Sequence, residues 1–274
     1  MKKDYTAFIA GLPEIAWSDR KRPLTVLDFR EQARNYIGGK DEELLNMLFL
    51  SNDNRQVLRL LNKREPIADL ETVYPLSLLE DEVREPEGLL PYYLNRFIAG
   101  FKDGHHEYTQ KPANILSAMY YDYMIDSGNA FLSGYAAFAR DLKNVLTALV
   151  CKKHARELVP EIVGDNEFSH ALKNSHAKDF GLAIEYPWVD QVITLMENKN
   201  LVERERGIDL LRWNYIEEAV TFKYFSIERV LAFAMELRII ERWSKMDSES
   251  GRRIFREMIE KFKKNLVFEK QFEQ

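Results

Sequence analysis

Residues 131–149, FLSGYAAFARDLKNVLTAL, decide the fold. Their large apolar residues follow one another at intervals of four, three, four, three and four positions: Phe131, Tyr135, Phe138, Leu142, Val145 and Leu149. This spacing follows the 3.6-residue period of an α-helix and puts all of these side chains on one face. The pattern predicts a helix whose apolar stripe packs into the core of its own chain.

A charge pattern in this stretch recurs elsewhere. Moving the sequence by 95 positions, without a gap, places Leu142 on Leu237, Asp141 on Glu236 and Lys143 on Arg238. Moving it by 88 positions the other way places the segment 141–146, DLKNVL, on the segment 53–58, DNRQVL. Apolar matches are common between amphipathic helices, so only the matched charges support an internal repeat. The alternative explanation for the matches is coincidence.

Each copy has an acid, a base two residues later and apolar residues beyond. We expect this repeated helix to bury its apolar residues and to hold its charges at the flank. The motif residues, to which we assign a structural role, are Asp53, Arg55, Asp141, Lys143, Glu236 and Arg238.

The composition favours helix throughout. Only 12 Gly and 9 Pro interrupt 274 residues, of which 46% are hydrophobic and 30% charged. The net charge of -5 comes from interspersed charges of both signs, so we expect no nucleic-acid partner. The apolar runs are shorter than the ~18–20 residues of a spanning helix, which argues against direct membrane insertion.

Turn-forming residues suggest where the helices end. We expect two helices within 26–63, separated at Gly38-Gly39, the second beginning with Asp41-Glu42-Glu43. Four prolines and the acids Glu80-Asp81-Glu82 favour a connector over 65–91, followed by a short helix over 92–100. A polar interval is expected over 160–187, with helices from Val189 onward and no strands.

The repeat divides the chain into units 1–85, 86–165 and 166–274. Units of about 90 residues are longer than the 20–45-residue repeats of a thin solenoid. We therefore expect an all-α fold of three repeated helical bundles around a pseudo-axis, with a funnel-like shape.

At Asp141-Leu142-Lys143-Asn144 and over 225–240, the chain resembles the C-subunit family of V/A-type rotary ATPases, whose member in the eukaryotic vacuolar enzyme is called the d subunit. The segment 8–13, FIAGLP, is similar to an uncharacterised bacterial family associated with V-type ATPase operons of Bacteroidetes-like bacteria. The chain departs from the C-subunit pattern by being shorter and by having Asn54 after the first acid.

The resemblance implies a non-catalytic central-stalk or rotor adaptor that links the stalk to the membrane ring and transmits torque. Its implied partners are the D/F-type stalk subunits and the proteolipid ring. The implied location is cytoplasmic, peripheral to the inner membrane through the ATPase complex, and no cofactor is implied.

The sequence lacks the common motifs of nucleotide, metal and catalytic sites, in agreement with a non-catalytic role. The chain has no Gly-x-x-x-x-Gly-Lys-Ser/Thr loop, no histidine pair at helical zinc-site spacing and no Gly-x-Ser-x-Gly, so we expect no nucleotide, metal or catalytic site. The lone Cys151 is expected to be buried, and the N-terminal segment lacks the apolar run of a signal peptide.

Two alternatives stay open: a helical protein-binding scaffold unrelated to rotary ATPases, and an all-helical enzyme with an unrecognised site. The basic amphipathic segment 252–264 is expected to pack on its own bundle, or else to contact a partner or an anionic membrane.

Overall fold

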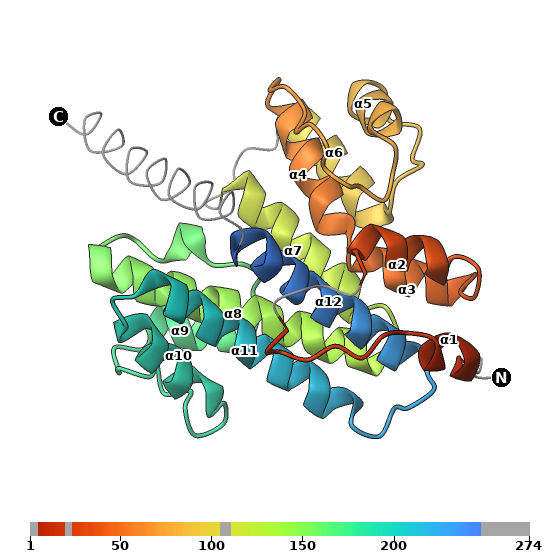
Figure 1. The fold of residues 1–274 in the computed structure, drawn as a ribbon. Coiled ribbons are helices and arrows are strands. Elements are labelled where there is room, and N and C mark those ends of the chain that lie inside the picture. Colours follow the sequence, from red (N-terminus) through yellow and green to blue (C-terminus); the bar gives the residue numbers. More distant parts are fainter. Residues whose placement is uncertain (1–4, 20–23, 105–110, 248–274) are drawn as a thin grey trace. The chain divides into compact units, whose positions relative to one another are not determined.

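The structure, a computed structural model, describes residues 5–19, 24–104 and 111–247, and all of its regular elements in these ranges are helices (Figure 1). The α-helices are α1 (Thr6–Ala10), α2 (Val26–Ala33), α3 (Lys40–Met47), α4 (Leu50–Leu61), α5 (Leu76–Arg84), α6 (Tyr92–Lys102), α7 (Pro112–Ile125), α8 (Ala130–His154), α9 (Glu167–Asn174), α10 (Trp188–Glu197), α11 (Leu201–Val220) and α12 (Ile227–Asp247). A 3-10 turn, Val159–Glu161, lies between α8 and α9. The predicted all-α class is confirmed.

The chain divides into two compact units. The central unit is Gly38–Tyr215, and the terminal unit combines Met1–Ile37 with Ile216–Gln274. These limits differ from the predicted boundaries after residues 85 and 165. Since a sequence repeat and a compact unit need not share their boundaries, the three-unit division and the funnel-like arrangement stay predictions.

Helix α8 contributes to a hydrophobic core of the central unit and packs against α7, α9 and α10. Phe138, Leu142 and Val145 are buried in this core, with Tyr135 and Leu149 packed against it. The Phe138 ring stacks on the Tyr215 ring, with 4.3 Å between ring centroids. The predicted stripe is confirmed, and Cys151 on the same helix is buried as expected.

The stretch 26–63 contains more helices than the sequence predicted. Three helices, not two, lie within 26–63, because the chain ends α3 and begins α4 at Leu48-Phe49. Gly39, at the N-terminus of α3, has a φ of 63°, which glycine adopts at little cost. The acids Asp41, Glu42 and Glu43 occupy the first turn of α3, as predicted.

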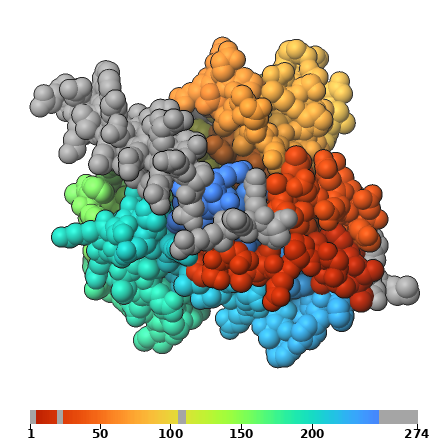
Figure 2. Space-filling view, viewed as in Figure 1, coloured from red at the N-terminus to blue at the C-terminus, as the bar shows by residue number. Residues whose placement is uncertain are grey.

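The predicted connector over 65–91 is wrong where α5 lies. Pro75 and Pro91 do not interrupt helices but stand at the N-caps of α5 and α6. In that position the missing proline N–H removes no helical hydrogen bond. Helices α5 and α6 both pack on α4, and Figure 2 shows the atoms of this region, orange to yellow, side by side at the top of the view.

The predicted short helix over 92–100 is confirmed as α6. The predicted polar interval over 160–187 contains α9, which opens with a capping box between Asn166 and Ser169. Helices α10, α11 and α12 follow, as expected from Val189 onward. The basic segment 252–264 lies outside the described residues.

The terminal unit has an aromatic core. The Phe29 ring on α2 lies 6.0 Å from the Phe8 ring of α1 and 5.2 Å from the Phe233 ring of α12, measured between centroids. The Val26 backbone N–H donates to the Glu241 carboxylate at 2.8 Å, which ties the first turn of α2 to α12. Segments from both ends of the chain therefore share one core.

Within residues 5–19, 24–104 and 111–247, no helix is both long enough and apolar enough to cross a bilayer.

Candidate interaction site

The three acids of the repeated motif are buried. Asp53 and Glu236 have 0% exposure and Asp141 has 9%. Among the bases, Arg55 is exposed, whereas Lys143 and Arg238 are half-buried. The expectation that all charges lie at the flank is therefore wrong for the acids, because these carboxylates make hydrogen bonds inside the protein.

On α4, the motif holds the segment that leads into α5. The Asp53 carboxylate accepts hydrogen bonds from the backbone N–H groups of Val73 at 3.0 Å and Tyr74 at 2.9 Å. The Gln56 amide donates to the Ile67 carbonyl and accepts from the Ile67 N–H, both at 2.9 Å. Gln56 thus satisfies both polar groups of one backbone residue, a two-bond arrangement that we call a clasp.

On α8, the aligned residues make a second clasp. The Asn144 amide donates to the Val163 carbonyl at 2.8 Å and accepts from the Val163 N–H at 2.9 Å. Asn144 and Val163 are both fully buried. Asp141 accepts from the Asn166 amide at 3.3 Å, and burial raises the pKa of Asp141 despite the Arg140 guanidinium beside it.

The two clasps occupy equivalent positions in the motif, since Gln56 and Asn144 each follow the acid by three residues. Both helices thereby hold a later stretch of irregular chain by its backbone. The third copy differs: Ile239 stands three residues after Glu236, so this copy has no amide for a clasp. The clasps were not predicted, and the only sign of them in the sequence is an amide at the same place in both copies.

Two bases of the motif, Lys143 and Arg55, have different environments. The Lys143 ammonium donates to the Ser117 hydroxyl of α7 at 3.1 Å, and burial lowers the pKa of Lys143. Arg55 faces solvent from α4. Lys143 is therefore held by a neighbouring helix, whereas Arg55 is open to solvent.

Glu236 has a different kind of partner. The guanidinium of Arg229 lies 3.2 Å from the Glu217 carboxylate and 3.5 Å from the Glu236 carboxylate. Burial, with Glu217 as the second cause, raises the pKa of Glu236 to about 8, while a hydrogen bond from Glu236 lowers the pKa of Glu217. At neutral pH, Glu236 is therefore a neutral donor to an ionised neighbour.

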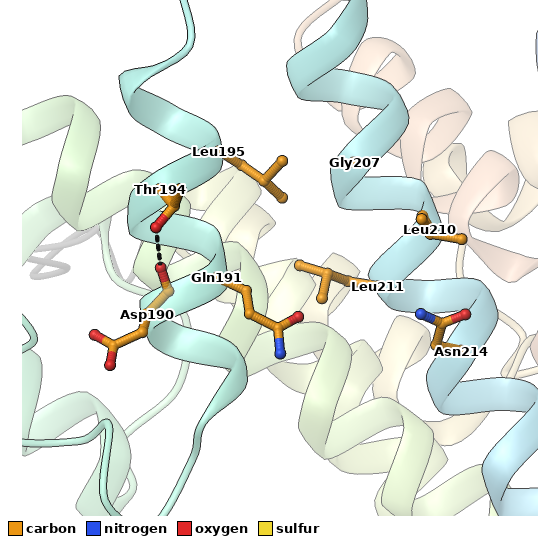
Figure 3. Close-up of a pocket in the computed structure, with 8 residues that line it drawn as sticks. All are labelled: Asp190, Gln191, Thr194, Leu195, Gly207, Leu210, Leu211 and Asn214. Carbon is orange, nitrogen blue, oxygen red and sulfur yellow. Dashed lines mark hydrogen bonds between the residues drawn. The ribbon is translucent and has the colours of Figure 1, made fainter.

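A groove lies between α10 and α11 in the central unit (Figure 3). Its volume is about 430 Å³, and it is lined by Asp190, Gln191, Thr194, Leu195, Gly207, Leu210, Leu211 and Asn214. Leu195 and Leu211 point toward each other across it, whereas the Asp190 carboxylate points away from α11. The walls are thus mainly apolar, with the Gln191 and Asn214 amides as polar groups.

The spacing of the lining residues gives the groove a direction. Gly207, Leu210, Leu211 and Asn214 stand at positions i, i+3, i+4 and i+7 of α11, and Gln191 and Leu195 stand at i and i+4 of α10. Each helix therefore lines the groove with one continuous stripe. A third helix lying along these stripes would meet two apolar ridges.

Gly207 makes the close approach of the two helices possible. A Cβ atom at this position would lie 2.2 Å from Cδ2 of Leu195. The space over Gly207 is thus filled by the Leu195 side chain, and a larger residue would push that side chain into the groove.

The described residues contain no group of three or more His, Cys, Asp and Glu side chains placed to hold a metal ion. The clasps are formed by side-chain amides, and the groove is lined mainly by apolar side chains. These groups bind chain segments and apolar surfaces by packing and hydrogen bonding.

The sequence model of one protein family, described as "Protein of unknown function (DUF2764)", matches residues 1–266. No curated protein and no solved structure matches the chain.

Proposed function

We propose that this chain, which belongs to the DUF2764 family of proteins of unknown function, is a non-catalytic adaptor of the central stalk of a V/A-type rotary ATPase. In this role it links the D/F-type stalk subunits to the proteolipid ring and transmits torque. The proposal begins from the resemblance at residues 141–144 and 225–240.

The observation that carries the proposal is the pair of clasps. The resemblance depends on a repeated helix, and Gln56 and Asn144 give two aligned copies of that helix the same local geometry. Similar sequence in unrelated helices would not require both amides to bind a single backbone residue at both its N–H and its C=O. The clasps therefore support a structural repeat over coincidence.

The clasps also suit a mechanical part. Torque is transmitted by elements that keep their geometry under load, and buried polar groups with complete hydrogen bonding favour one arrangement of the chain. Asp53, Gln56 and Asn144 are buried and hold backbone rather than facing the α10–α11 groove. The hydrogen bonds of these three side chains therefore stabilise the fold.

We assign contact with the stalk to the α10–α11 groove, with a stalk helix as its occupant. The two stripes of lining residues match a rod-shaped partner that presents an apolar ridge. Leu210 is 36% exposed, so its side chain is available to a partner without any change in the core.

Purification of the tagged full-length chain from membranes of its own organism tests this proposal. We expect the stalk and catalytic ATPase subunits to be recovered with it. A Leu210→Glu substitution should reduce that recovery roughly tenfold or more, because it places a charge against an apolar ridge. The measurement is quantitative mass spectrometry of the eluted subunits.

Leu89→Glu is the matched control, since Leu89 is 57% exposed and does not line the groove. It should leave the recovery unchanged. Recovery of other proteins without ATPase subunits, reduced by Leu210→Glu alone, would instead identify a protein-binding scaffold that uses the same groove. Equal recovery with both variants would contradict the assignment of the groove.

A further inference from the structure

Three charged side chains form a cluster on both sides of the turn that joins α11 to α12. Glu217 lies near the end of α11, whereas Arg229 and Glu236 lie on α12. The Arg229 guanidinium contacts both carboxyl groups, at 3.2 Å and 3.5 Å. One guanidinium thus faces two acids, and the cluster carries one negative charge too many if both acids are ionised.

Burial makes the extra charge costly. Glu236 has 0% exposure, and its Oε1 atom has no donor among the described groups around it. An ionised carboxylate in such a place loses its hydration without full replacement. A proton on Glu236 removes the charge and turns the carboxyl into a donor to Glu217.

The charged groups on the neighbouring helices act less strongly on Glu236 than Arg229 and Glu217 do. Helix α2 packs against α12 and carries Asp28, Arg30 and Glu31. Asp28 is bound to Thr25 in the capping box, and Glu31 is exposed. Arg30 is buried, but the charges that act most strongly on Glu236 are those of Arg229 and Glu217. Helix α1 has no charged residue.

We propose that Glu217, Arg229 and Glu236 form a binding site for a single proton, which holds α11 and α12 together at neutral pH and loosens them in alkaline solution. The proton resides on Glu236 and is shared in a hydrogen bond with Glu217. Its release leaves two buried carboxylates competing for Arg229. The proton site does not depend on the rotary-ATPase proposal.

The direction of the pH dependence follows from proton linkage. Glu236 has a pKa of about 8 in the folded protein, against a reference value of 4.5. Between these values the folded state binds the proton and the unfolded state does not, so stability falls as the pH rises from 4.5 to about 8. Glu217, whose pKa is lowered, affects stability only in acid, outside this range.

The first test compares the full-length chain with its Glu236→Gln variant, which keeps a neutral donor at the site. The equilibrium constant for unfolding of the wild-type chain should rise, relative to the variant, by up to about tenfold per pH unit between pH 5 and 8. Denaturant titrations at a series of pH values measure it. Parallel pH profiles for the two chains would overturn the proposal.

A second test observes the carboxyl groups directly and does not require the Glu236→Gln variant to fold. Carbon-13 NMR of glutamate-labelled chain should show one carboxyl titrating near pH 8. Glu217→Gln should move this titration to lower pH by removing a like charge. Arg229→Gln should move it to higher pH by removing the cation.

Glu218→Gln is the control, because Glu218 is the exposed neighbour of Glu217 and should leave the titration in place. Absence of any glutamate titrating above about pH 6.5, or shifts of the same sign in the Glu217 and Arg229 variants, would overturn the proposed site.

Discussion

Replacing Asn144 by Ala should lower the free energy of unfolding of the central unit by about 3 kcal/mol. The substitution removes both hydrogen bonds of the α8 clasp and leaves the N–H and C=O of Val163 buried without their partner. Each such group costs about 1–3 kcal/mol when it is not satisfied. Denaturant titration followed by circular dichroism measures the effect.

Asn62→Ala is the matched control, because Asn62 is exposed and its amide makes one bond, to the Leu58 carbonyl. We expect it to cost less than about 1 kcal/mol. Gln56→Ala should resemble Asn144→Ala in direction, since it removes the α4 clasp. Near-zero effects for both clasp variants would show that these amides do not hold the fold.

The second large effect is expected at Leu142, which is fully buried in the core formed around α8. Leu142→Ala should destabilise the central unit by about 3 kcal/mol, through lost burial and the cavity that remains. Val150→Ala on the same helix should cost less than about 1 kcal/mol, because Val150 is 38% exposed. Equal costs at the two positions would contradict the predicted stripe of α8.

The features that the sequence predicted well depend on local periodicity. The stripe of α8 follows the helical period over six residues, so its buried face could be identified without a structure. The acids in the first turn of α3 are another local signal, because they interact favourably with the helix N-terminus.

Helix α5 could not be predicted because a proline can either interrupt a helix or stand at its start. Within a helix a proline interrupts it, but Pro75 and Pro91 each stand at the start of one. The acidic run favours a solvent-exposed connector, yet Glu82 is buried and accepts hydrogen bonds from the N–H groups of Glu87 and Gly88. The sequence shows that these residues are acidic, but it does not show which backbone N–H groups they will bind.

The candidate site was less predictable than the fold. The clasps join residues that are 11 and 19 positions apart, and a polar side chain gives no local sign that it will be buried. The α10–α11 groove depends on the absence of a side chain at Gly207 and on the position of Leu195 above it. Such features arise from packing between helices, which single-sequence patterns do not specify.

The most direct test of the proposed role is native mass spectrometry of the rotary ATPase purified, through a tag on one of its catalytic subunits, from membranes of the organism that encodes this chain. Because the proposed adaptor binds a single central stalk, we expect one copy of the chain in each complex that retains both stalk and ring. Intact complexes of stalk, ring and catalytic subunits from which the chain is absent would contradict the proposed function.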